Sequence, residues 1–184
     1  MHGEGELHQK KIHGLRVLLA LENEQVARGL KHMLLSYGVS SSMAVDNRRA
    51  TNLMATETYN IIVTNESFPK LGGADFTRFI RLTDKPMAIA PIIYGLEMPS
   101  RERVLEARDA GATKVVAMPF TVTGLMKAIS LAMTDGRPIV QHTSYSGPDR
   151  RIANDTSYIG PERRYRSAAV ISWGDQLNML RSTL

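Results

Sequence analysis

The 184-residue sequence contains no cysteine, which excludes disulfide bonds, thiolate catalysis and cysteine-bound zinc. This absence is compatible with a reducing cytoplasm, where we expect the protein to reside. Aromatic residues make up only 6% of the chain, and no apolar run reaches the ~20 residues of a membrane-spanning helix. The first 14 residues lack the apolar stretch of a secretory signal. We therefore expect a globular protein that makes no contact with a membrane.

Length and charge divide the chain unevenly. At 184 residues it can hold one domain of ordinary size and a tail. The formal net charge is +5, and residues 137–184 carry seven basic and four acidic side chains. Helical and strand patterns stop after Gly136, where Ser, Tyr, Pro, Gly and Arg become frequent. We predict a flexible leader over residues 1–14, a domain over 15–134 and an arginine-rich tail over 135–184.

Within the predicted domain, short apolar runs alternate with amphipathic segments. The runs predicted to be strands are 15–21, 39–45, 61–63, 88–94 and 114–117. Each is followed by a helical pattern, and Asn23, Asp46 and Ser100 are suitable residues to cap three of these helices. Such alternation predicts a parallel sheet with helices on both faces. The expected fold class is α/β, a flavodoxin-like (βα)5 doubly wound sheet of strand order 2-1-3-4-5 with an irregular C-terminal tail.

The stretch Tyr59–Gly73, YNIIVTNESFPKLGG, resembles the third strand and following loop of response-regulator receiver domains, the CheY-like family. It keeps the tyrosine, the apolar run, Pro69 and Gly73 of that pattern. A second stretch, RDAGATKVVAMPF, is similar to the family's Asp-Ala-Gly-Ala segment and its Lys-Pro-Phe turn. The resemblance covers roughly residues 15–134. It implies a receiver fold and a role in two-component signal transduction.

The resemblance also implies where phosphoryl transfer would occur, at the carboxyl ends of the strands. Receivers phosphorylate an aspartate and use acids that hold Mg²⁺, a hydroxyl and a lysine. In this sequence the acidic pair falls on Leu21 and Glu22, the phosphoacceptor on Asn65, the hydroxyl on Leu96 and the lysine on Met118. Only Glu22 matches. We predict a pseudo-receiver that is not an enzyme, has no catalytic residue, metal or cofactor, and acts by binding.

A register shifted by one residue would instead put Glu66 at the acceptor position, but Pro69 and Gly73 fix the register against that shift. Such a pseudo-receiver is expected to act by binding, and a signalling protein is one expected partner. The candidates are a histidine kinase, another signalling target or a second copy of the chain. One interpretation is therefore a decoy receiver in a two-component phosphorelay, with the tail only a solvated linker.

The tail contains an eight-residue phrase twice, SYSGPDRR over 144–151 and SYIGPERR over 157–164. Each copy combines a tyrosine, a Gly-Pro turn, an acid and two arginines. Arginine can pair with the edge of guanine or with phosphate, an acid accepts hydrogen bonds from guanine, and tyrosine stacks on a base. Two copies suggest a ligand with two similar halves.

The tail resembles the arginine-rich C-terminal extensions of a group of CheY-like proteins that bind cyclic di-GMP. The resemblance implies that this chain is a cyclic di-GMP effector or adaptor. The predicted ligand-binding residues are Tyr145, Asp149, Arg150, Arg151, Tyr158, Glu162, Arg163 and Arg164. That group generally keeps its phosphoacceptor, which this chain does not. Nucleic acid is disfavoured as a ligand because acids lie between the arginines.

We expect residues 137–184 to be flexible without ligand and to contribute little to the stability of the domain. Within them, 167–184 has helical spacing of apolar residues. This segment is predicted to be a short amphipathic helix whose apolar side packs on the domain, a second copy of the chain or another protein.

Overall fold

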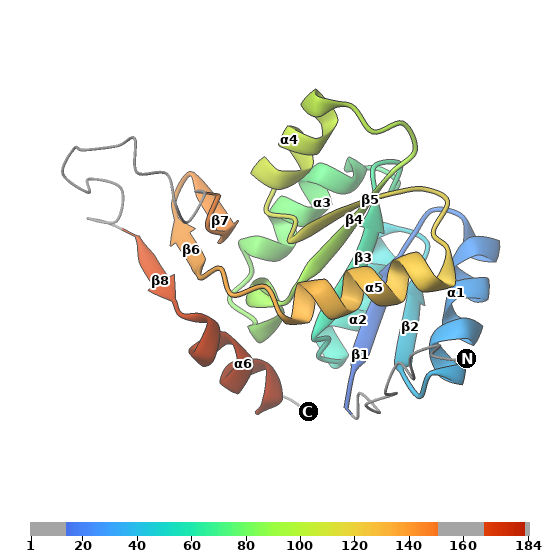
Figure 1. Cartoon of the computed structure of the whole chain (residues 1–184), viewed down its shortest axis with the longest axis horizontal. Helices are drawn as coiled ribbons and strands as arrows, with labels where there is room; N and C mark the ends of the chain where they lie inside the picture. Colours follow the sequence, from blue (N-terminus) through green and yellow to red (C-terminus); the bar gives the residue numbers. More distant parts are fainter. Residues whose placement is uncertain (1–13, 151–167, 183–184) are drawn as a thin grey trace, which may run out of the picture.

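The computed structural model describes residues 14–150 and 168–182. Five parallel strands form a sheet in the order β2-β1-β3-β4-β5, with helices on both faces (Figure 1). The fold class and strand order predicted from the sequence are confirmed. The strands are β1 (Arg16–Ala20), β2 (Ser40–Ala44), β3 (Ile61–Asn65), β4 (Ile92–Leu96) and β5 (Lys114–Ala117). The helices of the domain are α1 (Glu24–Ser36), α2 (Asn47–Thr56), α3 (Gly72–Arg81), α4 (Arg101–Asp109) and α5 (Val122–Met133).

Side-chain caps determine where four of these helices begin. Asn23, Asp46, Ser100 and Thr121 each accept a hydrogen bond from a main-chain N–H in the first turn of the helix that follows. Each cap satisfies one of the donors that a helix start leaves unpaired. In the described part of the chain, no helix combines the length and apolar character needed to cross a bilayer.

The core has two main layers because the central strands are apolar on both sides. On one face, residues of α1 and α5 such as Leu30, Leu34 and Ile129 pack against β1, β3 and β4. On the other face, residues of α2 and α3 pack against the alternate positions of the same strands, with Phe76 and Ile80 fully buried. Continuous apolar strands are typical of a parallel sheet that is covered on both faces.

The strand predicted over 88–94 is displaced toward the C-terminus. Residues Pro86–Ile89 form a short 3₁₀ helix, η1, and β4 begins only at Ile92. Pro91 explains the difference because a proline has no N–H to give to a sheet ladder and favours the first position of a strand. Its carbonyl accepts a hydrogen bond from Ile62 N, so Pro91 marks the edge of the pairing with β3.

The tail is more regular than predicted. After α5 the chain forms an antiparallel hairpin of β6 (Ile139–His142) and β7 (Tyr145–Pro148), and β8 (Ala169–Ile171) pairs with the other side of β6. A last helix, α6 (Trp173–Arg181), follows β8. These elements lie along one side of the domain (Figure 1). The C-terminal helix is therefore present, and the prediction of an irregular tail is wrong for these elements.

The described elements of the tail also pack into the domain. Ile139 and Leu180 are 1% and 2% exposed and belong to the same core cluster as α2 and α3. Gln176 is buried, and its side-chain amide donates to the carbonyl of Ile89 in η1. The apolar side of α6 was predicted to pack on the domain, a second copy of the chain or another protein. Leu180 packs on the domain. Helix α6 therefore packs against η1, the segment that leads into β4.

Candidate binding sites at the sheet edge and in the tail

Asn65 is the last residue of β3 and lies at the carboxyl end of the sheet. Its main chain is in register with Gly95 of β4, and its side chain is 5% exposed. The Oδ1 atom of Asn65 forms no hydrogen bond with the described residues. A neutral amide is a poor nucleophile and carries no charge to attract a cation.

The other residues at this edge are mostly apolar. Leu21 directly follows β1, Leu96 ends β4, and both are buried. Met118 follows β5, and a Cβ added to Gly95 would lie 3.0 Å from the Met118 sulfur, so the thioether covers the register partner of Asn65. Glu22 is exposed to solvent. The fold therefore places these predicted positions at the carboxyl ends of four strands, with one carboxylate among them.

Glu66, the alternative acceptor, is engaged elsewhere. One oxygen of its carboxylate accepts a hydrogen bond from Glu97 N at 2.8 Å, and the other pairs with Arg103 of α4 at 2.9 Å. Gly73 closes the loop tightly, because a Cβ there would come within 2.0 Å of the Asn65 carbonyl oxygen. The pair of Glu66 with Arg103 was not predicted. No local pattern could have revealed it, since 37 residues separate the partners.

In the tail, the first copy of the phrase forms β7 and the residues after it. The guanidinium of Arg150 lies 4.0 Å from the centre of the Tyr145 ring, a favourable cation–π geometry. The same guanidinium donates to Asp109, at the end of α4, with a distance of 2.8 Å. Tyr145 donates its hydroxyl hydrogen to the Pro148 carbonyl, and burial raises the pKa of Tyr145.

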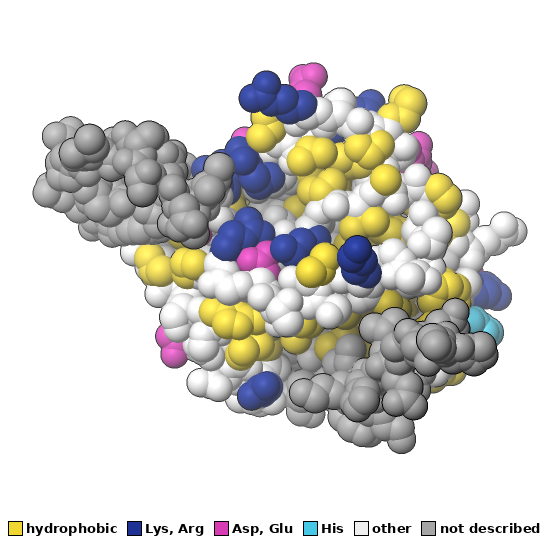
Figure 2. Space-filling view, in the orientation of Figure 1, with side chains coloured by type: hydrophobic (Ala, Val, Ile, Leu, Met, Phe, Trp, Pro, Cys, Tyr) yellow, Lys and Arg dark blue, Asp and Glu magenta, His cyan; other side chains and the backbone are white. Residues whose placement is uncertain are grey.

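Three of the eight predicted ligand-binding residues are thus seen, and they lie together. Asp149 follows β7 directly, and its main-chain N–H donates to the Pro138 carbonyl at 2.8 Å. The remaining five, Arg151, Tyr158, Glu162, Arg163 and Arg164, lie outside the described residues. Figure 2 shows Lys and Arg side chains gathered where the tail meets the domain, with few acidic side chains among them.

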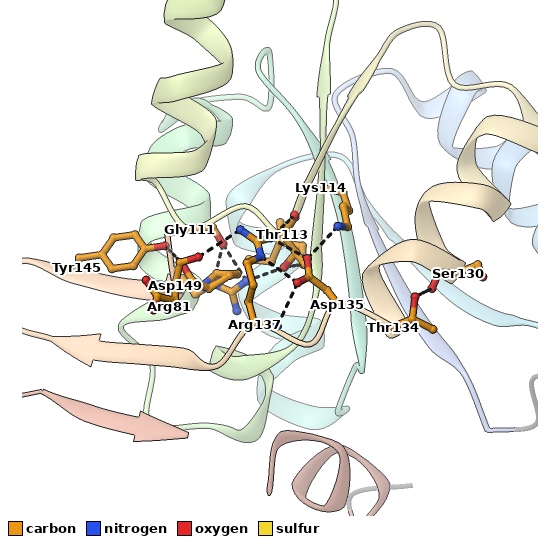
Figure 3. Close-up of polar contacts among 12 residues, drawn as sticks. Arg81, Gly111, Thr113, Lys114, Ser130, Thr134, Asp135, Arg137, Tyr145 and Asp149 are labelled. Atoms are coloured by element: carbon orange, nitrogen blue, oxygen red, sulfur yellow. Dashed lines mark hydrogen bonds and ion pairs between the residues drawn. The ribbon is translucent and has the colours of Figure 1, made fainter. Parts of the chain in front are cut away.

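An ionic cluster fastens the start of the tail to β5 (Figure 3). Asp135 accepts hydrogen bonds from Arg137 at 2.7 and 2.8 Å and pairs with Lys114 at 2.9 Å. Although burial raises the pKa of Asp135, the hydrogen bonds from Arg137 and Lys114 outweigh this effect and lower it to about 2. Arg137 also donates to the Thr113 carbonyl at 2.9 Å. The tail therefore leaves α5 in a fixed direction.

Arg81 of α3 lies fully buried beneath this part of the tail (Figure 3). Its guanidinium donates to the carbonyls of Ala88, Ala90 and Gly111 at 2.6–3.0 Å. Desolvation lowers the pKa of Arg81 to about 10, so the side chain stays charged at neutral pH. Several carbonyl oxygens thus replace the water that a buried charge would lose.

The sequence is similar to those of several bacterial regulatory proteins. The chain is 30% identical over 125 residues to the transcriptional regulatory protein PdtaR of Mycobacterium tuberculosis, a match covering 67% of this chain and 59% of that protein. It is 24% identical over 116 residues to the chemotaxis protein CheY of Pseudomonas aeruginosa, covering 62% of this chain and 93% of CheY. The matched part of the chain is therefore similar to response-regulator receiver domains.

The solved structures agree on the fold of this receiver domain. Chemotaxis protein CheY4 of Vibrio cholerae superposes with a TM-score of 0.61 at 22% identity, over 64% of this chain and 98% of that structure. No family model matches the sequence. The chain spans less than two thirds of the length of PdtaR.

Proposed function

We propose that this chain is a receiver-type signalling protein that acts by binding and does not accept a phosphoryl group. The observation that carries the proposal is the side-chain chemistry at the carboxyl end of the sheet. An acyl phosphate requires a carboxylate nucleophile, and its formation requires cations that balance the developing charge. Asn65, Leu96 and Met118 provide none of these groups.

Glu66 does not replace the missing acceptor. Its carboxylate is held by the Glu97 N–H and by Arg103, so an attack on a phosphodonor would first have to break both interactions. These contacts instead join the loop after β3 to the start of α4. We infer that the edge has a structural role in this chain.

The proposal is tested by incubating the full chain with acetyl phosphate and Mg²⁺ and measuring its intact mass. We expect no phosphate adduct. A matched control carries Leu21→Asp, Asn65→Asp, Leu96→Thr and Met118→Lys, which supplies the missing groups on the same fold and should gain an adduct. A labile adduct on the unmodified chain that disappears in Glu66→Gln would refute the proposal and restore the phosphorelay reading.

We further propose that the tail binds a guanine dinucleotide, cyclic di-GMP being the candidate. The observation that favours it is the stacked pair of Tyr145 and Arg150 with Asp149 beside them. A guanidinium whose one face covers a tyrosine ring can offer its other face to a base and its edge to a phosphate. In the structure Asp109 occupies that edge, so a ligand must displace this carboxylate.

Isothermal titration of the full chain with cyclic di-GMP, cyclic di-AMP, GTP and a short oligonucleotide tests this second proposal. We expect saturable binding that is selective for guanine and is weakened by Arg150→Lys, which keeps the charge and loses the planar fork. Binding of the oligonucleotide alone, with a steep dependence on salt, would move the function to nucleic acid. Absence of binding would leave a protein-interaction module.

A further inference from the structure

The first copy of the phrase is seated where only glycine fits. Gly147 crosses Gly111, in the turn between α4 and β5, so closely that a Cβ on Gly147 would lie 2.8 Å from the Gly111 Cα. A Cβ on Gly111 would in turn lie 2.7 Å from the Ser146 carbonyl oxygen. Both residues have positive φ, 152° and 104°, which side chains other than glycine adopt at a cost. The surface therefore selects a strand with glycine at this position.

Two charged residues complete this surface. Arg81 holds the Gly111 carbonyl from below, and Asp109 receives the guanidinium of Arg150. We call Arg81, Asp109 and Gly111 the docking corner. It recognises a glycine in the strand and an arginine three residues later.

The second copy of the phrase carries the same features at the same spacing. Gly160 and Arg163 correspond to Gly147 and Arg150, and a tyrosine and a proline are also repeated. One column of the phrase changes the kind of residue, Ser146 against Ile159. Ser146 is buried, and its hydroxyl has no hydrogen-bond partner among the described residues. An isoleucine at this position would remove the cost of burying an unpaired hydroxyl, and this gain would offset the cost of fitting a larger side chain.

We propose that residues 157–164 bind the docking corner in place of residues 144–151 of the same chain, so that the two copies exchange on one surface. A tethered segment is present at high effective concentration, which favours exchange within one chain over exchange between chains. This inference does not depend on the identity of any ligand.

Loop lengths set the balance between the two states. In the structure two residues, 143–144, connect β6 to the docked copy. Docking of the second copy would lengthen this connection to residues 143–157, which disfavours it about twentyfold. It would also shorten the link to β8 from residues 149–168 to 162–168, which favours it about fivefold, so the second state is about fourfold less populated if the contacts are equal. Residues 162–168 would then lead back to β8. When extended, these seven residues span about 23 Å, enough to cross a small sheet whose strands lie about 5 Å apart.

Because the chain has no cysteine, engineered cysteines report on this exchange without background. Arg108→Cys is combined with Arg151→Cys to detect the first copy, or with Arg164→Cys to detect the second. Both designs leave the pair of Asp109 and Arg150 intact. The full chain is treated with a short bismaleimide, and linked peptides are quantified by mass spectrometry. We expect the 108–151 product to exceed the 108–164 product about fourfold.

Gly147→Val should reverse this ratio, since its side chain cannot pass Gly111, and the 108–164 product should become the major one within single chains. Adding Gly160→Val should abolish it. The proposal is overturned if the 108–164 yield in Gly147→Val does not exceed that of the control pair Arg108→Cys with Ser182→Cys, or if the product forms only between chains.

A further variant, Ser146→Ile, gives the first copy the divergent residue of the second and tests the fit without disturbing the glycine. It should keep the 108–151 product and a cooperative urea transition. Loss of that product would mean that Ile159 cannot be seated at the docking corner, which would overturn the proposal even if Gly147→Val failed to fold.

Discussion

Replacing Leu180 by alanine tests whether the tail is a structural part of the receiver domain. Leu180 lies in α6, is 2% exposed, and packs in the core cluster that also contains Ile139, Met87 and Ile89. Met179, its neighbour in the same helix, is 44% exposed. Leu180→Ala and Met179→Ala therefore change adjacent positions of one helix, but only the first removes buried side-chain atoms.

Truncating a buried leucine costs about 2–5 kcal/mol, because apolar contacts are lost and a cavity remains. The upper end applies only if α6 stays docked. If the helix instead releases from the domain, the loss is limited to the free energy that docks it. For Leu180→Ala we therefore expect a decrease of about 2–3 kcal/mol in the free energy of unfolding. Met179→Ala should change it by less than about 0.5 kcal/mol.

Urea unfolding followed by circular dichroism measures both variants, and the slope of the transition shows whether the tail unfolds together with the domain. Truncation after Gly136 provides the limiting case, because it removes Ile139 and Leu180 and uncovers Arg81. Equal stability of Leu180→Ala and Met179→Ala, together with an unchanged transition in the truncated chain, would refute the packing of α6. The tail would then be the flexible extension that the sequence predicted.

Two further predictions concern charged groups of the tail. The folded state lowers the pKa of Asp135 from 3.8 to about 2. This carboxylate therefore contributes stability that is present above about pH 4 and is lost as pH falls through 2. In urea titrations between pH 5 and 2, Asp135→Asn should lose up to about 2 kcal/mol less stability than the unmodified chain. If cyclic di-GMP uses Arg150, Asp109→Asn should tighten its binding by up to about fivefold, the value of an exposed ion pair. Weaker binding by this variant in calorimetry would argue against Arg150 as a ligand residue.

Sequence reasoning was most successful where the pattern repeats over many residues. Alternation of apolar runs with amphipathic segments predicted the α/β class and the strand order, and the structure confirms both. The three predicted caps are confirmed. They could be predicted from sequence because a cap depends only on residues three positions apart. The strand predicted over 88–94 begins only after Pro91. An apolar run alone does not show which of its residues pair with a neighbouring strand.

The same reasoning failed in the tail because its elements are short and depend on distant contacts. β6 and β7 have four residues each, and their turn, Thr143–Ser144, lacks the Asn-Gly or Asp-Gly that marks most two-residue hairpins. Arg137 donates to the carbonyl of Thr113, which directly precedes β5, and Arg150 donates to Asp109 at the end of α4. Only the two-residue spacing between IVQH and YSGP could have indicated a hairpin.

The docked tail limits how a ligand can act on this protein. Ile139 and Leu180 share a core cluster with Ile80 of α3 and Ile89 of η1, so any event that removes the tail also opens the amino end of the sheet. A ligand that bound only the undocked tail would lose affinity by the whole docking free energy, about 150-fold for a value of 3 kcal/mol. A ligand that displaces only Asp109 from Arg150 avoids this cost because β6, β7 and α6 stay in place. We therefore infer that a tail ligand selects the docked arrangement and stabilises the domain on binding.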